Sequence, residues 1–119
     1  ARPDCMIFSG FDEYMLDTLM IGGDGVIPAT SNFAPDVTCG IYRGYCDGDL
    51  AKDREQLRRL GILSRMYSMD RPFTGLIKES IRLSGLDIST ALVAPASPPD
   101  ADMAARVRAL LVQAQVIPA

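Results

Sequence analysis

The chain has 119 residues, with 12 basic and 15 acidic side chains and a formal net charge of −3. This length allows one domain or part of a larger one, and 48% hydrophobic residues suffice for a core. The acidic balance excludes the basic surface of a nucleic-acid-binding domain, and no apolar run reaches the roughly 18 residues of a membrane span. The lack of histidine excludes Ser-His, Cys-His and His-metal chemistry within these residues.

The first third of the sequence predicts one parallel βαβ unit. Residues 5–9 form a continuous apolar run, which is typical of a strand covered on both faces. An amphipathic helix is expected over 12–20, glycines at 22–25 end it, and a second buried strand is expected over 25–29. Because a helix connects them, the two strands are expected to be parallel neighbours with a right-handed crossover.

The remaining sequence predicts four helices and one irregular segment. Apolar residues spaced three and four apart place the helices over 35–47, 49–68, 72–83 and 101–115. Three prolines exclude regular structure from residues 87–99. On the second of these helices, Arg54, Arg58 and Arg59 are expected to form a solvated face.

The three cysteines predict no disulfide. Cys39 and Cys46 would lie about two turns apart on one helix, which is too far for a bond between them. Together with Cys5 they are expected to be reduced and buried, as in a cytosolic protein. The sequence therefore predicts a cytoplasmic location.

Two strands are too few for an independent parallel sheet. They leave a backbone edge open on each side, and hydrophobic edges of this kind favour association. The chain also begins with Ala1, directly before the first expected strand. We therefore expect the missing strands to exist elsewhere, and the chain to be truncated.

An ordered set of short motifs resembles one enzyme family. The set comprises FSGFDE at 8–13, GGDGVIP at 22–28 and SNFAP at 31–35. In this order they resemble the C-terminal part of the class I pyruvate-dependent aldolases, the dihydrodipicolinate synthase and N-acetylneuraminate lyase superfamily. The resemblance implies an α/β fold that is the C-terminal part of a (β/α)8 TIM barrel. Residues 1–33 would be the last βαβ unit, with the last two parallel strands, and residues 34–119 the final barrel helix and a C-terminal helical extension.

The resemblance implies a lyase that forms a Schiff base between a lysine and pyruvate. A desolvated lysine amine is nucleophilic at neutral pH, and the resulting iminium withdraws electrons from the neighbouring carbon. The family's lysine lies upstream of the part that these 119 residues resemble, so we expect no catalytic residue in this chain and no activity from it alone. Lys78 has a similar local sequence, but it lies in a helical region and is expected to be structural. No cofactor or metal is implied.

Barrel enzymes place their chemistry at the C-terminal ends of strands. The resemblance assigns substrate binding there to Ser9, Gly10, Asp12, Glu13, Ile27 and Thr30. Gly10 would lie beside the substrate or simply form a turn, and Ile27 would present its main-chain carbonyl to pyruvate. Asp12 and Glu13 would contact substrate hydroxyl groups or cap the helix that they begin.

The aldehyde substrate stays open at this stage. The lyase branch has a substrate-contacting serine where this chain has Ala29, and Thr30 or Ser31 would have to replace its hydroxyl. The branch is therefore dihydrodipicolinate synthase, a 2-keto-3-deoxy sugar acid aldolase or a relative of the lyase. The implied partners are pyruvate, an aldehyde, the rest of the barrel and further subunits in a homo-oligomer, commonly a tetramer, with no nucleic acid or membrane.

One alternative needs no enzyme. A mainly helical protein-binding module, whose two strands pair with another chain, would have the same expected elements.

Overall fold

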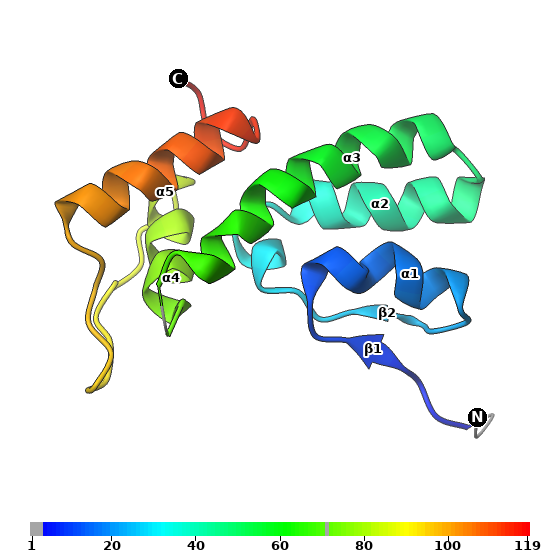
Figure 1. Ribbon diagram of the computed structural model, residues 1–119, viewed down its shortest axis with the longest axis horizontal. Coiled ribbons are helices and arrows are strands. Elements are labelled where there is room, and N and C mark those ends of the chain that lie inside the picture. Colours follow the sequence, from blue (N-terminus) through cyan, green and yellow to red (C-terminus); the bar gives the residue numbers. More distant parts are fainter. Residues whose placement is uncertain (1–3, 71) are drawn as a thin grey trace.

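Two short parallel strands lie beside a mainly helical chain (Figure 1). The computed structural model describes residues 4–70 and 72–119, with the side chains of all of these except 50, 52 and 53. Its elements are β1 (Phe8–Ser9), the 3₁₀ helix η1 (Asp12–Tyr14), α1 (Met15–Met20), β2 (Gly25–Val26), the 3₁₀ helix η2 (Ala29–Asn32), α2 (Pro35–Asp47), α3 (Leu50–Leu63), the 3₁₀ helix η3 (Ser64–Ser68), α4 (Thr74–Leu83) and α5 (Ala101–Gln113).

The predicted parallel pairing is confirmed. Phe8 pairs with Gly25 and Ser9 with Val26. Backbone bonds continue the ladder on both sides, since the Asp24 N–H donates to the Ile7 carbonyl at 2.8 Å and the Ile27 N–H to the Ser9 carbonyl at 3.0 Å. The strands themselves are shorter than the predicted 5–9 and 25–29, because regular pairing extends over only two residues of each.

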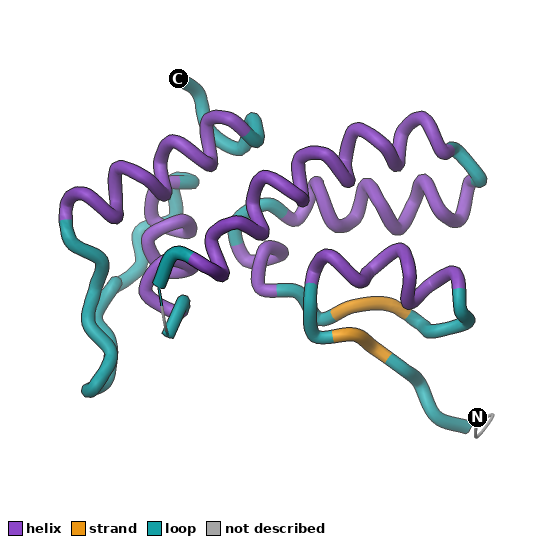
Figure 2. Tube along the Cα trace, in the orientation of Figure 1, coloured by secondary structure: helices purple, strands orange, loops and turns teal. Residues whose placement is uncertain are grey.

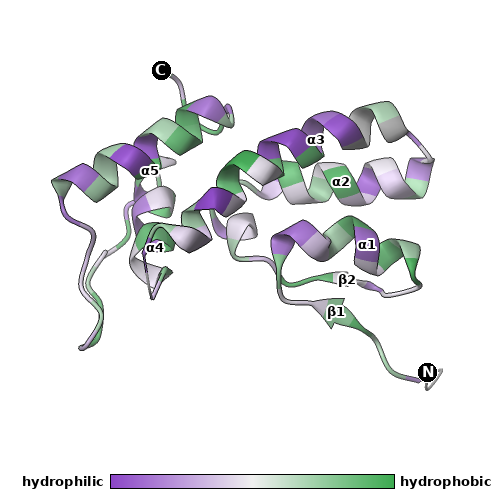
Figure 3. Cartoon of the chain, viewed as in Figure 1, coloured by the Kyte–Doolittle hydropathy of each residue, from purple (hydrophilic) through white to green (hydrophobic). Residues whose placement is uncertain are grey.

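Only one face of this sheet is covered by the described residues. α1 packs on the strands, and Val26 contributes to the core beneath it. Side-chain alternation places Phe8 and Ile27 on the opposite face, where they are 44% and 73% exposed, and Met6 is 66% exposed. The prediction of strands covered on both faces is therefore wrong for the described residues. Figure 3 shows the hydrophobic colour of β1 at the border of the molecule.

Local signals define α2, and its predicted bounds are confirmed. Pro35 occupies the first turn, where its missing N–H costs no hydrogen bond. Gly48 ends the helix with φ 69°, a left-handed conformation that favours glycine. The predicted helix 49–68 is α3 followed by η3, and those at 72–83 and 101–115 begin or end within two residues of α4 and α5. Figure 2 shows loop between α4 and α5, which confirms the irregular segment 87–99.

One hydrophobic core joins the helices. Its fully enclosed side chains come from α2, α3, η3, α4 and α5: Val37, Ile41, Leu63, Met66, Leu76, Val107 and Leu111. α2 and α3 pack side by side along their lengths, and α5 packs against α3 and α4 (Figure 1). The strand ends and the C-terminal helices therefore belong to one packed unit.

Two expectations about polar residues are wrong. Arg59 is not solvated, because its side chain is 11% exposed and its Nε donates to the carbonyl of Ala114 at 2.8 Å. Arg54 and Arg58 are exposed, as expected. The three cysteines are free but exposed, not buried, because none of them packs into the hydrophobic core of the described residues. Among the described residues, no helix is both long and apolar enough to cross a membrane.

Candidate functional site

The C-terminal ends of β1 and β2 meet at one edge of the sheet, as parallel pairing requires. The Ile27 N–H bond to the Ser9 carbonyl places the Ile27 main chain beside Ser9 and Gly10. Ser9 is half-buried, and Gly10 is exposed with no described atom within 4 Å of where a Cβ would lie. Three of the predicted substrate-binding residues thus come together around an open stretch of main chain.

Asp12 and Thr30 instead form a buried polar cluster with a third residue, Tyr67. Asp12 is 0% exposed and Thr30 1%. The Tyr67 hydroxyl donates to Oδ2 of Asp12, and the Tyr67 ring stacks edge-on against Phe73 with centroids 5.0 Å apart. The other carboxyl oxygen of Asp12 and the Thr30 hydroxyl are buried without a hydrogen-bond partner among the described residues. The cluster links the loops after both strands to the C-terminal helices.

Burial controls the ionisation of this cluster. Removal from water raises the pKa of Asp12, with a smaller contribution from the nearby Glu13, while the hydrogen bond from Tyr67 acts in the opposite direction. Burial and the adjacent carboxyl also raise the pKa of Tyr67, so its phenol keeps the proton that it donates. Asp12 makes no side-chain cap to η1, so the capping alternative is not observed for it.

Glu13 faces a separate hollow, although it adjoins Asp12 in sequence. This hollow has a volume of about 470 Å³ and is lined by Glu13, Gly61, Ser64, Arg65, Tyr67 and Ser68. We call it the η3 hollow, because four of its residues belong to η3. Glu13 is the residue that the loop after β1 contributes to its lining.

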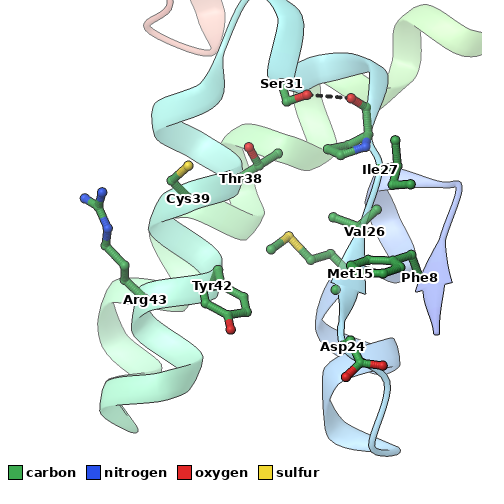
Figure 4. A pocket seen from close by; sticks show the side chains of 12 residues that line it. Phe8, Met15, Asp24, Val26, Ile27, Ser31, Thr38, Cys39, Tyr42 and Arg43 are labelled. Carbon is green, nitrogen blue, oxygen red and sulfur yellow. Dashed lines mark hydrogen bonds between the residues drawn. The ribbon is translucent and has the colours of Figure 1, made fainter. Parts of the chain in front are cut away.

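A larger and more apolar pocket lies between β2 and α2 (Figure 4). Its volume is about 590 Å³, and it is lined mainly by Phe8, Met15, Val26, Ile27, Thr38, Cys39 and Tyr42. Two polar groups at its border are already engaged: the Asp24 carboxylate accepts from the Ile7 N–H at 2.6 Å, and the Ser31 hydroxyl donates to the Pro28 carbonyl at 2.7 Å. Tyr42 and Arg43 of α2 also line it. This pocket therefore has the character of a packing surface.

The sequence did not predict a role for Tyr67 or Arg65 at the strand ends. Tyr67 follows Met66 in an apolar stripe that predicts a core position, and nothing local links it to Asp12, 55 residues earlier. Lys78, by contrast, lies where a structural residue was expected. Its amine donates to the carbonyl of Ala91 at 2.7 Å, which ties α4 to the irregular segment. No group of three potential metal ligands gathers within residues 4–70 and 72–119.

Comparison with known proteins gives one consistent family. The sequence model of the dihydrodipicolinate synthetase family matches residues 1–114. The chain is 40% identical over 113 residues to the putative 2-dehydro-3-deoxy-D-gluconate aldolase YagE of Escherichia coli, which covers 95% of this chain and 37% of YagE. It is also 36% identical over 118 residues to the probable 2-dehydro-3-deoxy-D-pentonate aldolase YjhH of the same organism. That alignment covers 99% of this chain and 39% of YjhH.

Solved structures agree with this similarity. A crystal structure of YagE in complex with pyruvate aligns with 97% of this chain at 38% identity and a TM-score of 0.91. The dihydrodipicolinate synthase of Thermotoga maritima aligns with 98% at 30% identity and a TM-score of 0.84. The chain spans only 39% of the length of either structure.

Proposed function

The chain belongs to the dihydrodipicolinate synthetase family, and we propose that it is the C-terminal part of an aldolase acting on pyruvate and a hydroxylated aldehyde. The observation that carries this proposal is the TM-score of 0.91 to a family structure that binds pyruvate. Among the branches left open by the sequence, the names of YagE and YjhH favour the 2-keto-3-deoxy sugar acid aldolases.

In this proposal β1 and β2 are the last two strands of a (β/α)8 barrel. The exposed face with Phe8 and Ile27 would face the barrel interior, and the open edge of β2 would pair with the first strand. The pocket between β2 and α2 would be filled by side chains of the preceding βα units. Its mainly apolar lining supports this occupant over a small polar ligand.

The chemistry would take place above the strand ends. A lysine from the preceding part of the barrel would add to C2 of pyruvate with loss of water, and loss of a proton from C3 would give an enamine. The enamine carbon then attacks the aldehyde carbon, and hydrolysis releases the product and the free amine. The bound pyruvate would lie against the open main-chain surface at the C-terminal ends of β1 and β2. This surface is formed by Ser9, Gly10 and the main chain of Ile27.

Asp12 and Thr30 receive a different role from the one that the resemblance implied. Both are buried, and Asp12 is engaged by Tyr67, so we assign them to holding the strand-end loops against the C-terminal helices. Glu13 is exposed and remains a proposed substrate contact. The 119-residue chain would be inactive alone, because the Schiff-base lysine would lie upstream of it. The bond of the Lys78 amine to the Ala91 carbonyl supports a structural role for that lysine.

Borohydride trapping tests this proposal. The full-length gene product, incubated with pyruvate and sodium borohydride, should gain the mass of a reduced pyruvate adduct on a lysine outside these 119 residues. The 119-residue chain alone should gain none. An adduct mapped to Lys52 or Lys78 would contradict the assignment of the nucleophile, and a full-length product with no adduct would contradict the aldolase.

A second candidate is supported by the uncovered sheet face. A non-enzymatic helical module would use Met6, Phe8 and Ile27 to pair with another protein. It predicts no adduct in any form of the protein.

A further inference from the structure

The η3 hollow contains one negatively and one positively charged side chain, and neither forms an ion pair with a described residue. The carboxylate of Glu13 and the guanidinium of Arg65 are both exposed, and neither forms an ion pair or side-chain hydrogen bond within residues 4–70 and 72–119. On α3, by contrast, Arg58 pairs with Glu55 at 2.9 Å. Two unpaired opposite charges therefore line one hollow of about 470 Å³.

The remaining lining adds hydroxyl groups. The Ser64 hydroxyl donates to the Leu60 carbonyl at 2.7 Å and the Ser68 hydroxyl to the Arg65 carbonyl at 2.9 Å. Each serine oxygen keeps free lone pairs and can still accept a hydrogen bond. The hollow thus offers donors from Arg65 and acceptors from Glu13, Ser64 and Ser68, with formal charges that cancel.

This donor and acceptor set fits a neutral chain with several hydroxyl groups. A hydroxyl donates one hydrogen bond and accepts others, so adjacent hydroxyls satisfy a carboxylate and a guanidinium together. An anion would gain from Arg65 and be repelled by Glu13. An apolar ligand would leave both charges desolvated without partners.

The hollow also adjoins the strand ends. Glu13 follows Asp12, and Tyr67 both lines the hollow and donates to Asp12, so one wall of the hollow is the tyrosine that holds the loop after β1.

We propose that the η3 hollow binds the hydroxyl groups of the aldehyde substrate, with Arg65 as a specificity-determining residue supplied by the C-terminal helical extension. This rests on the proposed aldolase function. It adds a contribution from residues 64–68, which neither the motifs of the sequence nor the relatives' names assign.

The test compares two aldehydes of equal length in the full-length gene product. D-glyceraldehyde carries two hydroxyl groups and propionaldehyde none. Arg65→Ala should raise KM for D-glyceraldehyde about tenfold, as expected for loss of a hydrogen bond to a charged group. It should leave KM for pyruvate, the borohydride adduct and kcat/KM for propionaldehyde unchanged. Arg65→Lys should restore part of the loss, because it keeps the charge and some donors.

Arg108→Ala is the matched control, since Arg108 is an exposed arginine on α5 that lines neither this hollow nor the neighbouring pocket that Arg65 shares with Arg106. Unchanged kinetics for D-glyceraldehyde in Arg65→Ala would overturn the inference, and so would equal losses for both aldehydes, which indicate a general distortion. Absence of the pyruvate adduct in the wild-type protein would overturn the proposed function and this inference with it.

Discussion

Asp12 shows how a single residue can change its role between sequence and structure. Its position directly after a strand end, in a motif shared with an aldolase family, predicts a substrate contact or a helix cap. The structure buries it completely and gives its carboxyl a hydrogen bond from Tyr67. No pattern in the sequence could predict this, because the partner lies 55 residues away and its own neighbours indicate a core position.

The buried carboxyl predicts a specific pH dependence of stability. Because burial raises the pKa of Asp12 above the roughly 3.9 of an exposed aspartate, the folded state binds the proton more tightly than the unfolded state. This residue's contribution is therefore most favourable below the unfolded pKa and is lost as pH rises through the folded pKa. An asparagine side chain does not titrate, so the stability of Asp12→Asn relative to wild type should increase with pH from about 4 upward.

Urea unfolding at a series of pH values measures this difference. Asp12→Ala provides the contrast, since it leaves the Tyr67 hydroxyl without its acceptor and should be less stable than Asp12→Asn by about 1–3 kcal/mol at every pH. A stability difference between Asp12→Asn and wild type that is constant with pH would contradict the burial of an ionisable carboxyl.

At the scale of elements, local signals predicted the helices well and the strands poorly. α2 begins at Pro35 and ends before Gly48, and both residues act on their own backbone. The strands depend on partners for their length, and the described residues offer each strand a single neighbour. Apolar runs at 5–9 and 25–29 therefore indicate the existence of the strands and not their bounds.

The packing of α2, α3 and α5 depends on one arginine that the sequence placed in solvent. Arg59 donates from Nε to the Ala114 carbonyl at 2.8 Å, from Nη2 to the Gln115 carbonyl at 3.3 Å, and pairs with Asp36 at 2.9 Å. Asp36 is 61% exposed, so the ion pair itself contributes little. The bond to the carbonyl of the buried Ala114 is the more important interaction.

Arg59→Ala should therefore lower the free energy of unfolding by about 1–3 kcal/mol, because it leaves carbonyl groups at the end of α5 without a donor. Arg58→Ala is the matched control one residue earlier, and it should leave stability almost unchanged, since its pair with Glu55 is exposed. Chemical denaturation followed by circular dichroism compares the two variants. Equal effects would show that Arg59 does not join the helices.

For the molecule as a whole, the uncovered sheet face is the feature that most needs a partner. The sequence predicts that the two parallel strands require more sheet, because continuous apolar runs are typical of strands covered on both faces. The structure identifies the exposed apolar side chains of this face as Met6, Phe8 and Ile27. The apolar pocket between β2 and α2 is open as well. The barrel and the binding module differ in what would cover these side chains: further strands of the same sheet or another protein.

One substitution measured in two contexts distinguishes these possibilities. Ile27 is 73% exposed in this chain, so Ile27→Thr should change the stability of the 119-residue chain by less than about 0.5 kcal/mol. In the full-length gene product the barrel would bury this side chain, and the same change should cost about 1–3 kcal/mol. Ile41→Thr, at a position with 0% exposure, is the control that should destabilise both proteins. If Ile27→Thr is equally mild in both, the face is open in the whole protein, and the binding module is favoured over the barrel.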